Sequence, residues 1–276
     1  MKKNSLIIFG SGIISKNIIN LLEKRFYHKF EIKLVIQEIM DKHEKKYEYD
    51  LKNFTSSKVI KIRKLNSAII NYIKDINFDY LIAANISFII PNILIKKVNI
   101  MALGIHASLL PKNKGFAPLN WSILNGDKYT GVSIFKLNNR IDSGKIIYQK
   151  KFKIYKYDNV SSLFKKACNC FNDGFLFFFN NHKKIKLKRQ KGKSSFNYKR
   201  YPKDSEILEH HKMIDVNNLI KASQPPYPYS YIFFKKKLFV KSFIVLKRKY
   251  VKKILVKDKF IYFKTSDGFQ LRLIKV

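Results

Sequence analysis

Long apolar runs and disulfide-forming cysteines are both missing from this chain of 276 residues. No stretch reaches the roughly 18 consecutive apolar residues that a transmembrane helix needs, so membrane insertion is not expected. The two cysteines, Cys168 and Cys170, lie two positions apart on an expected helix and point in different directions, which disfavours a disulfide between them. We interpret them as core thiols in a reducing compartment and expect a cytoplasmic location.

Acidic residues are scarce, since 19 Asp and Glu stand against 56 Lys and Arg, for a formal net charge of +37. Such an excess is typical of proteins that bind a polyanion, such as nucleic acid or a membrane surface. The chain is also rich in Ile, Asn, Phe and Tyr and uses Lys more than Arg, a bias that AT-rich coding would produce in any protein. Selection for anion binding and codon composition both stay open as explanations.

The first part of the chain alternates short apolar strands with amphipathic helices. We expect strands at Leu6–Phe9, Ile32–Ile36, Lys58–Ile62, Tyr80–Ala84, Ile100–Leu103, Thr130–Leu137 and Lys145–Phe152. We expect helices at Ile13–Phe26, Ser67–Ile76, Pro91–Lys97, Trp121–Asn125 and Val160–Phe179. This alternation predicts an α/β fold with a mostly parallel sheet and right-handed crossovers.

The rest of the chain differs in composition. Lys183–Arg200 carries nine basic residues with little apolar periodicity, so we interpret it as a linker. After an expected helix at Val216–Ala222 come β-rich runs at Tyr231–Phe234, Leu238–Val245, Lys253–Val256, Phe260–Phe263 and Leu271–Ile274. They predict a small antiparallel β-barrel. The expected division is an α/β domain at 1–182, a basic linker at 183–209 and a C-terminal β domain at 210–276.

The segment from Gly104 to Gly144 contains the candidate catalytic residues. His106 follows an apolar run and would emerge at the carboxyl end of a strand, where open α/β sheets bind ligands. Asp142 lies much later, in a turn between two strands, and would orient the imidazole if that turn folds back over the sheet. Taken alone, each residue also fits a structural role. A zinc site is disfavoured because no second His or Cys lies at ligand spacing from His106.

Several ordered motifs in this segment resemble one enzyme family. HASLLPKNKGFAPLNW, then NGDKYTGVSIF, then IDSGKII are similar to the catalytic core of the folate-dependent formyltransferases. That pattern runs Asn-x-His-x-Ser-Leu-Leu-Pro-x-x-Arg-Gly-x-Ala-Pro, then Thr-Gly-Val, then Asp-Thr-Gly. The resemblance implies a Rossmann-like domain with helices on both faces of its sheet, which binds 10-formyltetrahydrofolate, and a C-terminal barrel of the oligonucleotide-binding (OB) type. No metal is implied.

The resemblance also implies roles for individual residues. In the family an amine attacks the formyl carbon of the folate, a His and an Asn stabilise the oxyanion, and an Asp positions the His and helps to remove the amine proton. These roles fall on His106 and Asp142, whereas Gly104 stands at the position of the Asn. A backbone N–H near Gly104, or the side chain of Asn85 or Asn120, is then the expected substitute donor.

The binding residues are carried over in the same way. The resemblance assigns the folate site to Ser87, Phe88, Ile89, Ile90, Ser108, Leu109, Leu110, Pro111 and Ile141. It assigns the amine substrate to Lys114, Gly115 and Asn120. Lys114 replaces the usual Arg, which keeps the charge and loses the planar guanidinium. NAD binding is disfavoured, because Gly10 and Gly12 have no third glycine in register.

Two amine acceptors remain. APLNWSILNG is more similar to UDP-4-amino-4-deoxy-L-arabinose formyltransferase and other sugar enzymes, which implies a nucleotide-linked amino sugar. Enzymes that act on initiator methionyl-tRNA usually carry a basic insertion ending in Pro-x-Pro-Val-Lys, whereas Gln37–Ser57 has mixed charge and no proline. The basic run Lys183–Arg200 keeps tRNA as the alternative. A degenerate, non-catalytic homologue that binds nucleic acid is the third hypothesis.

Overall fold

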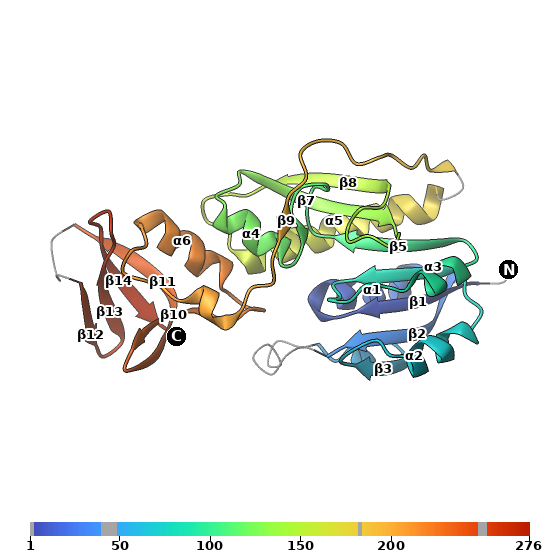
Figure 1. Ribbon diagram of the computed structural model, residues 1–276, viewed down its shortest axis with the longest axis horizontal. Coiled ribbons are helices and arrows are strands. Elements are labelled where there is room, and N and C mark those ends of the chain that lie inside the picture. The colour runs from blue at the N-terminus through green and yellow to red at the C-terminus, as the bar shows by residue number, and fades with distance from the viewer. Residues whose placement is uncertain (1–2, 40–48, 182–183, 248–252) are drawn as a thin grey trace.

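A computed structural model describes residues 3–39, 49–181, 184–247 and 253–276. Most of the segment Gln37–Ser57, whose composition bears on tRNA binding, is covered, but 40–48 lies outside the described residues. The first residue of the expected linker, Lys183, lies outside them as well. The chain forms a larger α/β part and a smaller C-terminal part beside it (Figure 1).

A seven-stranded sheet forms the centre of the larger part. Its strands are β1 (Asn4–Gly10), β2 (Phe30–Glu38), β3 (Lys58–Ile62), β4 (Tyr80–Ala84), β5 (Met101–His106), β7 (Tyr129–Lys136) and β8 (Ile146–Lys153). Their order is β3-β2-β1-β4-β5-β7-β8. The strands from β3 to β5 in this order pair in parallel, whereas β5 with β7 and β7 with β8 pair antiparallel. The expected mostly parallel α/β sheet is confirmed.

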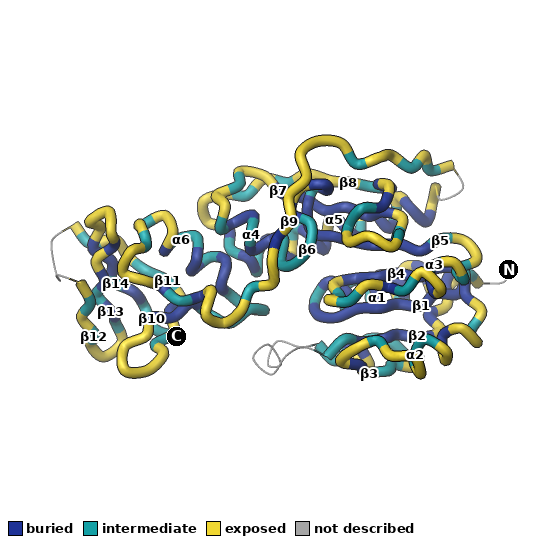
Figure 2. Tube along the Cα trace, viewed as in Figure 1, coloured by how far each residue is buried: buried dark blue, intermediate teal, exposed yellow. Residues whose placement is uncertain are grey.

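Helices cover both faces of this sheet. They are α1 (Gly12–Arg25), α2 (Ser67–Lys74), α3 (Asn92–Lys97), α4 (Pro118–Leu124) and α5 (Val160–Asn181), with a short 3-10 helix at Leu51–Phe54. Leu6 and Ile8 of β1 belong to the apolar cluster that includes α1 and α5, whereas Ile7 and Phe9 belong to the cluster with α2 and α3. Because both faces are covered, β1 and β4 are buried along nearly their whole length (Figure 2).

The two cysteines lie on the buried face of the long helix α5. Cys168 and Cys170 are both free and buried in the cluster between α5 and the sheet, so their expected role as core thiols is confirmed. Burial raises the pKa of the Cys168 thiol to about 11, which keeps the thiol protonated at neutral pH. Among the described residues no helix is long and apolar enough to span a bilayer.

The C-terminal part packs one helix against a second sheet. Helix α6 (Met213–Ala222) contributes Val216, Leu219 and Ile220 to a separate apolar cluster. The strands are β10 (Ser230–Phe234), β11 (Lys236–Leu246), β12 (Ile254–Lys257), β13 (Phe260–Lys264) and β14 (Gln270–Lys275). All pairs are antiparallel, in the order β10-β11-β14-β13-β12. Within the described residues β10 and β12 do not pair, so the expected barrel is corrected to a half-barrel.

The segment after α5, which the sequence predicts as a linker, contacts the α/β part. Lys188 exchanges two backbone hydrogen bonds with Ile146 at the edge of the larger sheet. Further on, β9 (Phe196–Asn197) pairs in parallel with β6 (Lys114–Gly115), and a 3-10 helix follows at Pro202–Ser205. The chain therefore runs along the α/β part (Figure 1) and contacts the region that holds His106.

Helix α4 begins earlier than the sequence indicates. Periodicity predicts helix over Trp121–Asn125, whereas the helix runs from Pro118 to Leu124. Pro118 stands in the first helical turn, where its missing N–H costs nothing, and Ala117 before it adopts φ of 46°. The three extra residues bring Asn120 into the helix and next to the cavity described below.

Candidate active site

A cavity of about 190 Å³ opens at the carboxyl ends of β4 and β5. Ten residues predicted to bind or react line it: Ser87, Phe88, Ile89, Ile90, Gly104, His106, Gly115, Asn120, Ile141 and Asp142. The loop after β4 forms one wall, and the turn between β7 and β8 forms another. The topology of the sheet thus brings together segments that lie far apart in the sequence.

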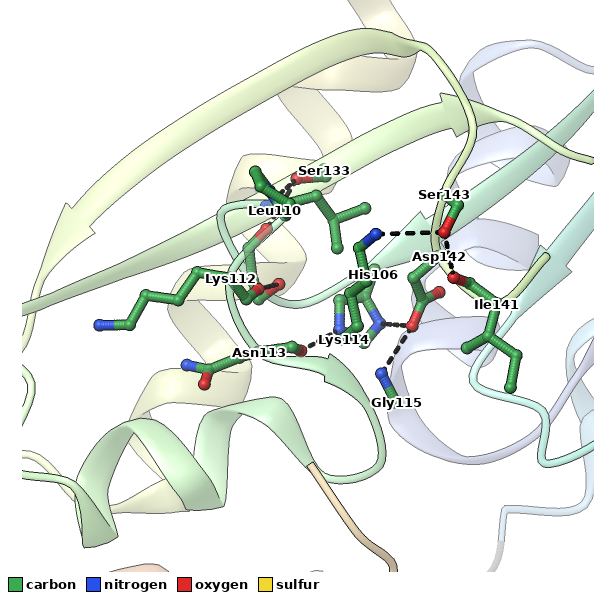
Figure 3. A network of polar contacts seen from close by, with 12 residues as sticks. His106, Leu110, Lys112, Asn113, Lys114, Gly115, Ser133, Ile141, Asp142 and Ser143 are labelled. Carbon is green, nitrogen blue, oxygen red and sulfur yellow. Dashed lines mark hydrogen bonds and ion pairs between the residues drawn. The ribbon is translucent and has the colours of Figure 1, made fainter. Parts of the chain in front are cut away.

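His106 and Asp142 meet at this cavity, as the sequence analysis expects. His106 is the last residue of β5 and is 8% exposed, and Asp142 lies in the turn between β7 and β8. The imidazole Nδ1 lies 3.4 Å from Asp142 Oδ2 (Figure 3). Because β7 runs antiparallel to β5, its last residue, Lys136, lies opposite Leu103, and the turn that follows must fold back over the sheet to bring Asp142 to His106.

The other ring nitrogen of His106 also faces an acceptor. Nε2 lies 2.6 Å from the backbone oxygen of Asn113, as Figure 3 shows. Nδ1 thus faces a carboxylate and Nε2 faces a carbonyl, and these two partners fix the orientation of the ring.

The turn that carries Asp142 is held from several sides. The backbone N–H of Gly115 donates to Asp142 Oδ2 at 2.8 Å, and Lys114 Nζ donates to Ser143 Oγ at 3.1 Å. Gln190 donates through Nε2 to the backbone oxygens of Asp142 at 2.8 Å and Gly144 at 3.0 Å. Asp142 itself adopts φ of 46°, a left-handed conformation that non-glycine residues rarely adopt.

Gly104 lines the cavity, but there is no room for a side chain there. A Cβ atom at this position would lie 2.4 Å from Cζ of Phe135 and 2.9 Å from Cδ2 of Leu137. Phe135 is 2% exposed and lines the same cavity, so its ring occupies the space that the family's Asn would need. The sequence does not reveal this pairing, because the ring comes from β7 across the sheet.

Neither amide proposed as a substitute donor is free. Asn85 Nδ2 donates to the backbone oxygen of Ser11 at 3.3 Å and to its hydroxyl at 3.2 Å. Asn120 Nδ2 donates to the backbone oxygen of Ala222 at 2.7 Å. Asn120 Oδ1, in contrast, is buried and has no partner among the described residues. An acceptor without a partner at this position suits a ligand that brings an N–H.

The wall formed by Ser87–Ile90 is fixed by Glu38 at the end of β2. Its carboxylate accepts the backbone N–H of Ser87 at 2.8 Å and also the Ser87 hydroxyl. Ile89 is 54% exposed and Ile141, on the opposite wall, is 44% exposed. Two apolar side chains with access to solvent therefore stand at the mouth, where a flat ring could pack between them.

The remaining predicted binding residues do not line the cavity in the part of the chain that the structure describes. They are Ser108, Leu109, Leu110, Pro111 and Lys114. Ser133 Oγ donates to the backbone oxygen of Ser108 at 2.7 Å and accepts the N–H of Leu110 at 3.2 Å. Pro111 accepts the backbone N–H of Ser195. These contacts place the segment behind His106, where it supports the loop that leads to Asn113.

Several residues that line the cavity are not predicted from the sequence. Arg140 precedes the Asp142 turn, its side chain is exposed, and it adds a cation to the wall. Phe116, Asn138 and Tyr227 also line the cavity, the last from the segment between α6 and β10. No group of three or more His, Cys, Asp or Glu in the described ranges lies close enough to hold a metal ion.

Comparisons with known proteins identify the family of this chain. The profile of the family described as Formyl transferase matches residues 2–172. Bifunctional polymyxin resistance protein ArnA from Wigglesworthia glossinidia brevipalpis is 33% identical over 182 residues, which cover 63% of this chain and 27% of that protein. Methionyl-tRNA formyltransferase from Malacoplasma penetrans (strain HF-2) is 30% identical over 259 residues, which cover 86% of this chain and 77% of that protein.

A solved structure extends the likeness to the whole fold. The N-formyltransferase from Helicobacter canadensis, solved with folinic acid and dTDP-3-aminofucose, superposes with a TM-score of 0.68 at 19% identity. The match covers 98% of this chain and 99% of that one, and therefore includes the C-terminal half-barrel. From the matched profile over residues 2–172, we conclude that this chain belongs to the formyl transferase family.

Proposed function

We propose that this protein moves a formyl group from 10-formyltetrahydrofolate to a primary amine. The observation that carries the proposal is the approach of His106 and Asp142 to 3.4 Å at the edge of the cavity. Family membership supplies the reaction class, and the pair supplies the two groups that the reaction needs. His106 lines the cavity, where its ring can stabilise the negative charge that develops on the formyl oxygen.

The reaction forms a bond between the amine nitrogen and the formyl carbon and breaks the bond between that carbon and the folate nitrogen. The amine nitrogen attacks the formyl carbon, and the carbonyl oxygen becomes an oxyanion that the His106 imidazole stabilises. The bond between that carbon and N10 of the folate then breaks, which leaves a formamide. The amine loses a proton with help from Asp142, and the folate nitrogen gains one as it leaves. Asp142 also orients the ring through Nδ1.

The folate is proposed to lie between Ser87–Ile90 and Ile141. Because Glu38 fixes the backbone at Ser87, the peptide groups of this loop are held ready to pair with the edge of a pterin ring. Ile89 and Ile141 would pack on the faces of the ring. Ser108–Pro111 would support the site from behind His106, since their polar groups are already engaged with Ser133 and Ser195.

The acceptor is proposed to be a nucleotide-linked amino sugar. The Helicobacter canadensis enzyme, solved with dTDP-3-aminofucose, matches nearly the full length of this chain. Asn120 Oδ1 would accept an N–H of the amine. Gly115 and Lys114 contact the turn that carries Asp142, and would lie beside the sugar. Arg140 would offer its guanidinium to a phosphate.

Initiator methionyl-tRNA is the second candidate acceptor. The 30% identity over 259 residues to the enzyme from Malacoplasma penetrans and the net charge of +37 favour it. We also propose, for either acceptor, a Rossmann-like first domain that ends at 182 and an OB-type second domain that begins after 209. A cytoplasmic location is proposed as well, because free, buried cysteines suit a reducing compartment.

One assay distinguishes these acceptors. The purified chain is incubated with 10-formyltetrahydrofolate and a panel of amino-sugar nucleotides, and in parallel with charged initiator tRNA. Mass spectrometry detects the added formyl group on each acceptor. Transfer to a sugar nucleotide alone supports the first acceptor, and transfer to the tRNA alone supports the second. Retention of tRNA without transfer to any acceptor would indicate a non-catalytic homologue.

A further inference from the structure

The basic segment after α5 contacts both partners of His106. Gln190 binds the turn that carries Asp142, and Ser195 binds the loop that carries Asn113. From this arrangement, and resting on the proposed function, we infer that Gln190 is a positioning residue that holds Asp142 against the His106 ring. The segment that composition marks as a solvated linker is thus part of the catalytic support.

The contacts of Gln190 are specific to the Asp142 turn. A primary amide has two N–H groups, and each can serve one of the two backbone oxygens, at 2.8 Å for Asp142 and 3.0 Å for Gly144. Oε1 is buried and has no partner among the described residues, so the side chain is held by its donors. The amide therefore closes the turn from outside the cavity.

Both flanks of Gln190 are fixed to the α/β part. On one side, Lys188 and Ile146 exchange backbone hydrogen bonds at 2.9 and 2.7 Å. On the other, Ser195 Oγ accepts the backbone N–H of Asn113 at 2.8 Å, and the oxygen of Ser195 accepts the N–H of Lys114 at 2.9 Å. A side chain between two anchored points has a defined position, which a positioning role requires.

The Asp142 turn needs such support. Asp142 adopts a left-handed φ of 46°, which surrounding contacts must maintain. Its carboxylate contacts the Gly115 N–H and His106 Nδ1, and the second contact is long at 3.4 Å. Without the Gln190 amide, the backbone oxygens of the turn lose two donors, and the turn is held only from the side of Lys114 and Gly115, so the carboxylate can shift relative to the ring. A displacement of about 1 Å can cost about 100-fold in rate.

The test is a double-mutant cycle on kcat. Gln190→Met removes the donors and keeps the length of the side chain, and we expect kcat to fall about 10–100-fold. In the Asp142→Asn background the same substitution should change kcat by less than about twofold, because the carboxylate it positions is already gone. Equal losses in both backgrounds would overturn the proposal, as would unchanged kcat in Gln190→Met alone.

Two further variants separate positioning from stability. Gln224 makes the same kind of contact in the C-terminal part, since its Nε2 donates to the backbone oxygens of Ile220 and Lys241. Gln224→Met should leave kcat unchanged, and a fall like that of Gln190→Met would count against a local effect. Gln190→Lys restores donors to both oxygens and should recover activity above Gln190→Met. An equal loss in both Gln190 variants would contradict the hydrogen-bond argument.

A spectroscopic readout does not depend on turnover. The ¹⁵N shift of His106 Nδ1 reports on its carboxylate partner, so Gln190→Met should move it in the same direction as Asp142→Asn does. An unmoved shift would refute the positioning role. If Asp142→Asn itself leaves kcat unchanged, the proposed function fails. If Asp142→Asn lowers kcat and Gln190→Met does not, only the inference about Gln190 fails.

Discussion

The ring of Phe135 fills the space that a side chain at Gly104 would need. A Cβ at position 104 would lie 2.4 Å from Phe135 Cζ and 2.6 Å from Cε2, closer than real Cβ atoms approach any neighbour. The glycine and the aromatic ring are therefore complementary across β5 and β7. Restoring the family's Asn requires a change at both positions.

This relationship predicts the outcome of Gly104→Asn. Alone, the substitution should destabilise the protein by about 1–3 kcal/mol through overpacking, without raising activity. With Phe135→Ala the new amide gains room, so the double variant should be less destabilised than the sum of the two single variants. Its kcat should also exceed that of Phe135→Ala alone, by at most about 10²–10³-fold for an added oxyanion donor. Urea unfolding measures the free energy of unfolding of each variant, and formyl-transfer kinetics measure kcat. If the destabilisation of the double variant equals the sum of the two single ones, the two positions do not interact.

Glu38 offers a test of the folate wall. Because its carboxylate holds both the N–H and the hydroxyl of Ser87, Glu38→Ala should loosen the Ser87–Ile90 loop. Because binding must then reorder the loop, we expect the KM for 10-formyltetrahydrofolate to rise about tenfold, which corresponds to about 1.4 kcal/mol, less than the full worth of a hydrogen bond to a charged group. The exposed Glu31, near the start of the same strand, is the matched control, and Glu31→Ala should leave this KM unchanged. Equal KM values in both variants would argue against a folate site at this wall.

Asp158 links stability to pH. Burial raises the pKa of this carboxyl, but hydrogen bonds from Lys166, the Tyr155 N–H and Ser162 lower it more, so the net pKa lies below the ordinary 3.8. The resulting stabilisation is fully present above pH 3.8 and is lost as pH falls through the folded-state pKa. Asp158→Asn should therefore cost about 1.5–3 kcal/mol at pH 7, and this difference should shrink below about pH 4.

The matched control for Asp158 is an exposed ion pair between Asp173 of α5 and Lys150 of β8. Asp173 and Lys150 lie 2.6 Å apart with side chains 50% and 47% exposed, so Asp173→Asn should cost less than about 1 kcal/mol. Thermal unfolding of the parent and both variants between pH 3 and pH 7 provides the measurement. A difference for Asp158→Asn that does not change with pH would contradict the assigned hydrogen bonds.

Sequence patterns predict the fold where local signals agree. The expected strands Lys58–Ile62 and Tyr80–Ala84 have the observed bounds, because apolar β-branched residues end at clear turn signals. Helix α4 is predicted three residues late, since Pro118 interrupts the periodicity that identifies a helix. The half-barrel differs from the expected barrel because the strand runs do not reveal whether the two edges pair.

Some residues of the candidate site are also predictable from local sequence patterns, and others are not. His106 and Asp142 are predictable, because ordered motifs on both sides of β7 carry them. Phe135 and Gln190 are not, because their contacts cross the sheet or come from a segment whose composition indicates only charge.

The most direct test of the proposed function is the rate of formyl transfer from 10-formyltetrahydrofolate by the parent chain and by His106→Ala and Asp142→Asn, with unfolding transitions recorded beside each. On whichever acceptor the parent uses, we predict that both variants stay folded and lose about 10²–10⁴-fold in kcat. Folded variants that both transfer the formyl group at the parent's rate would contradict the account.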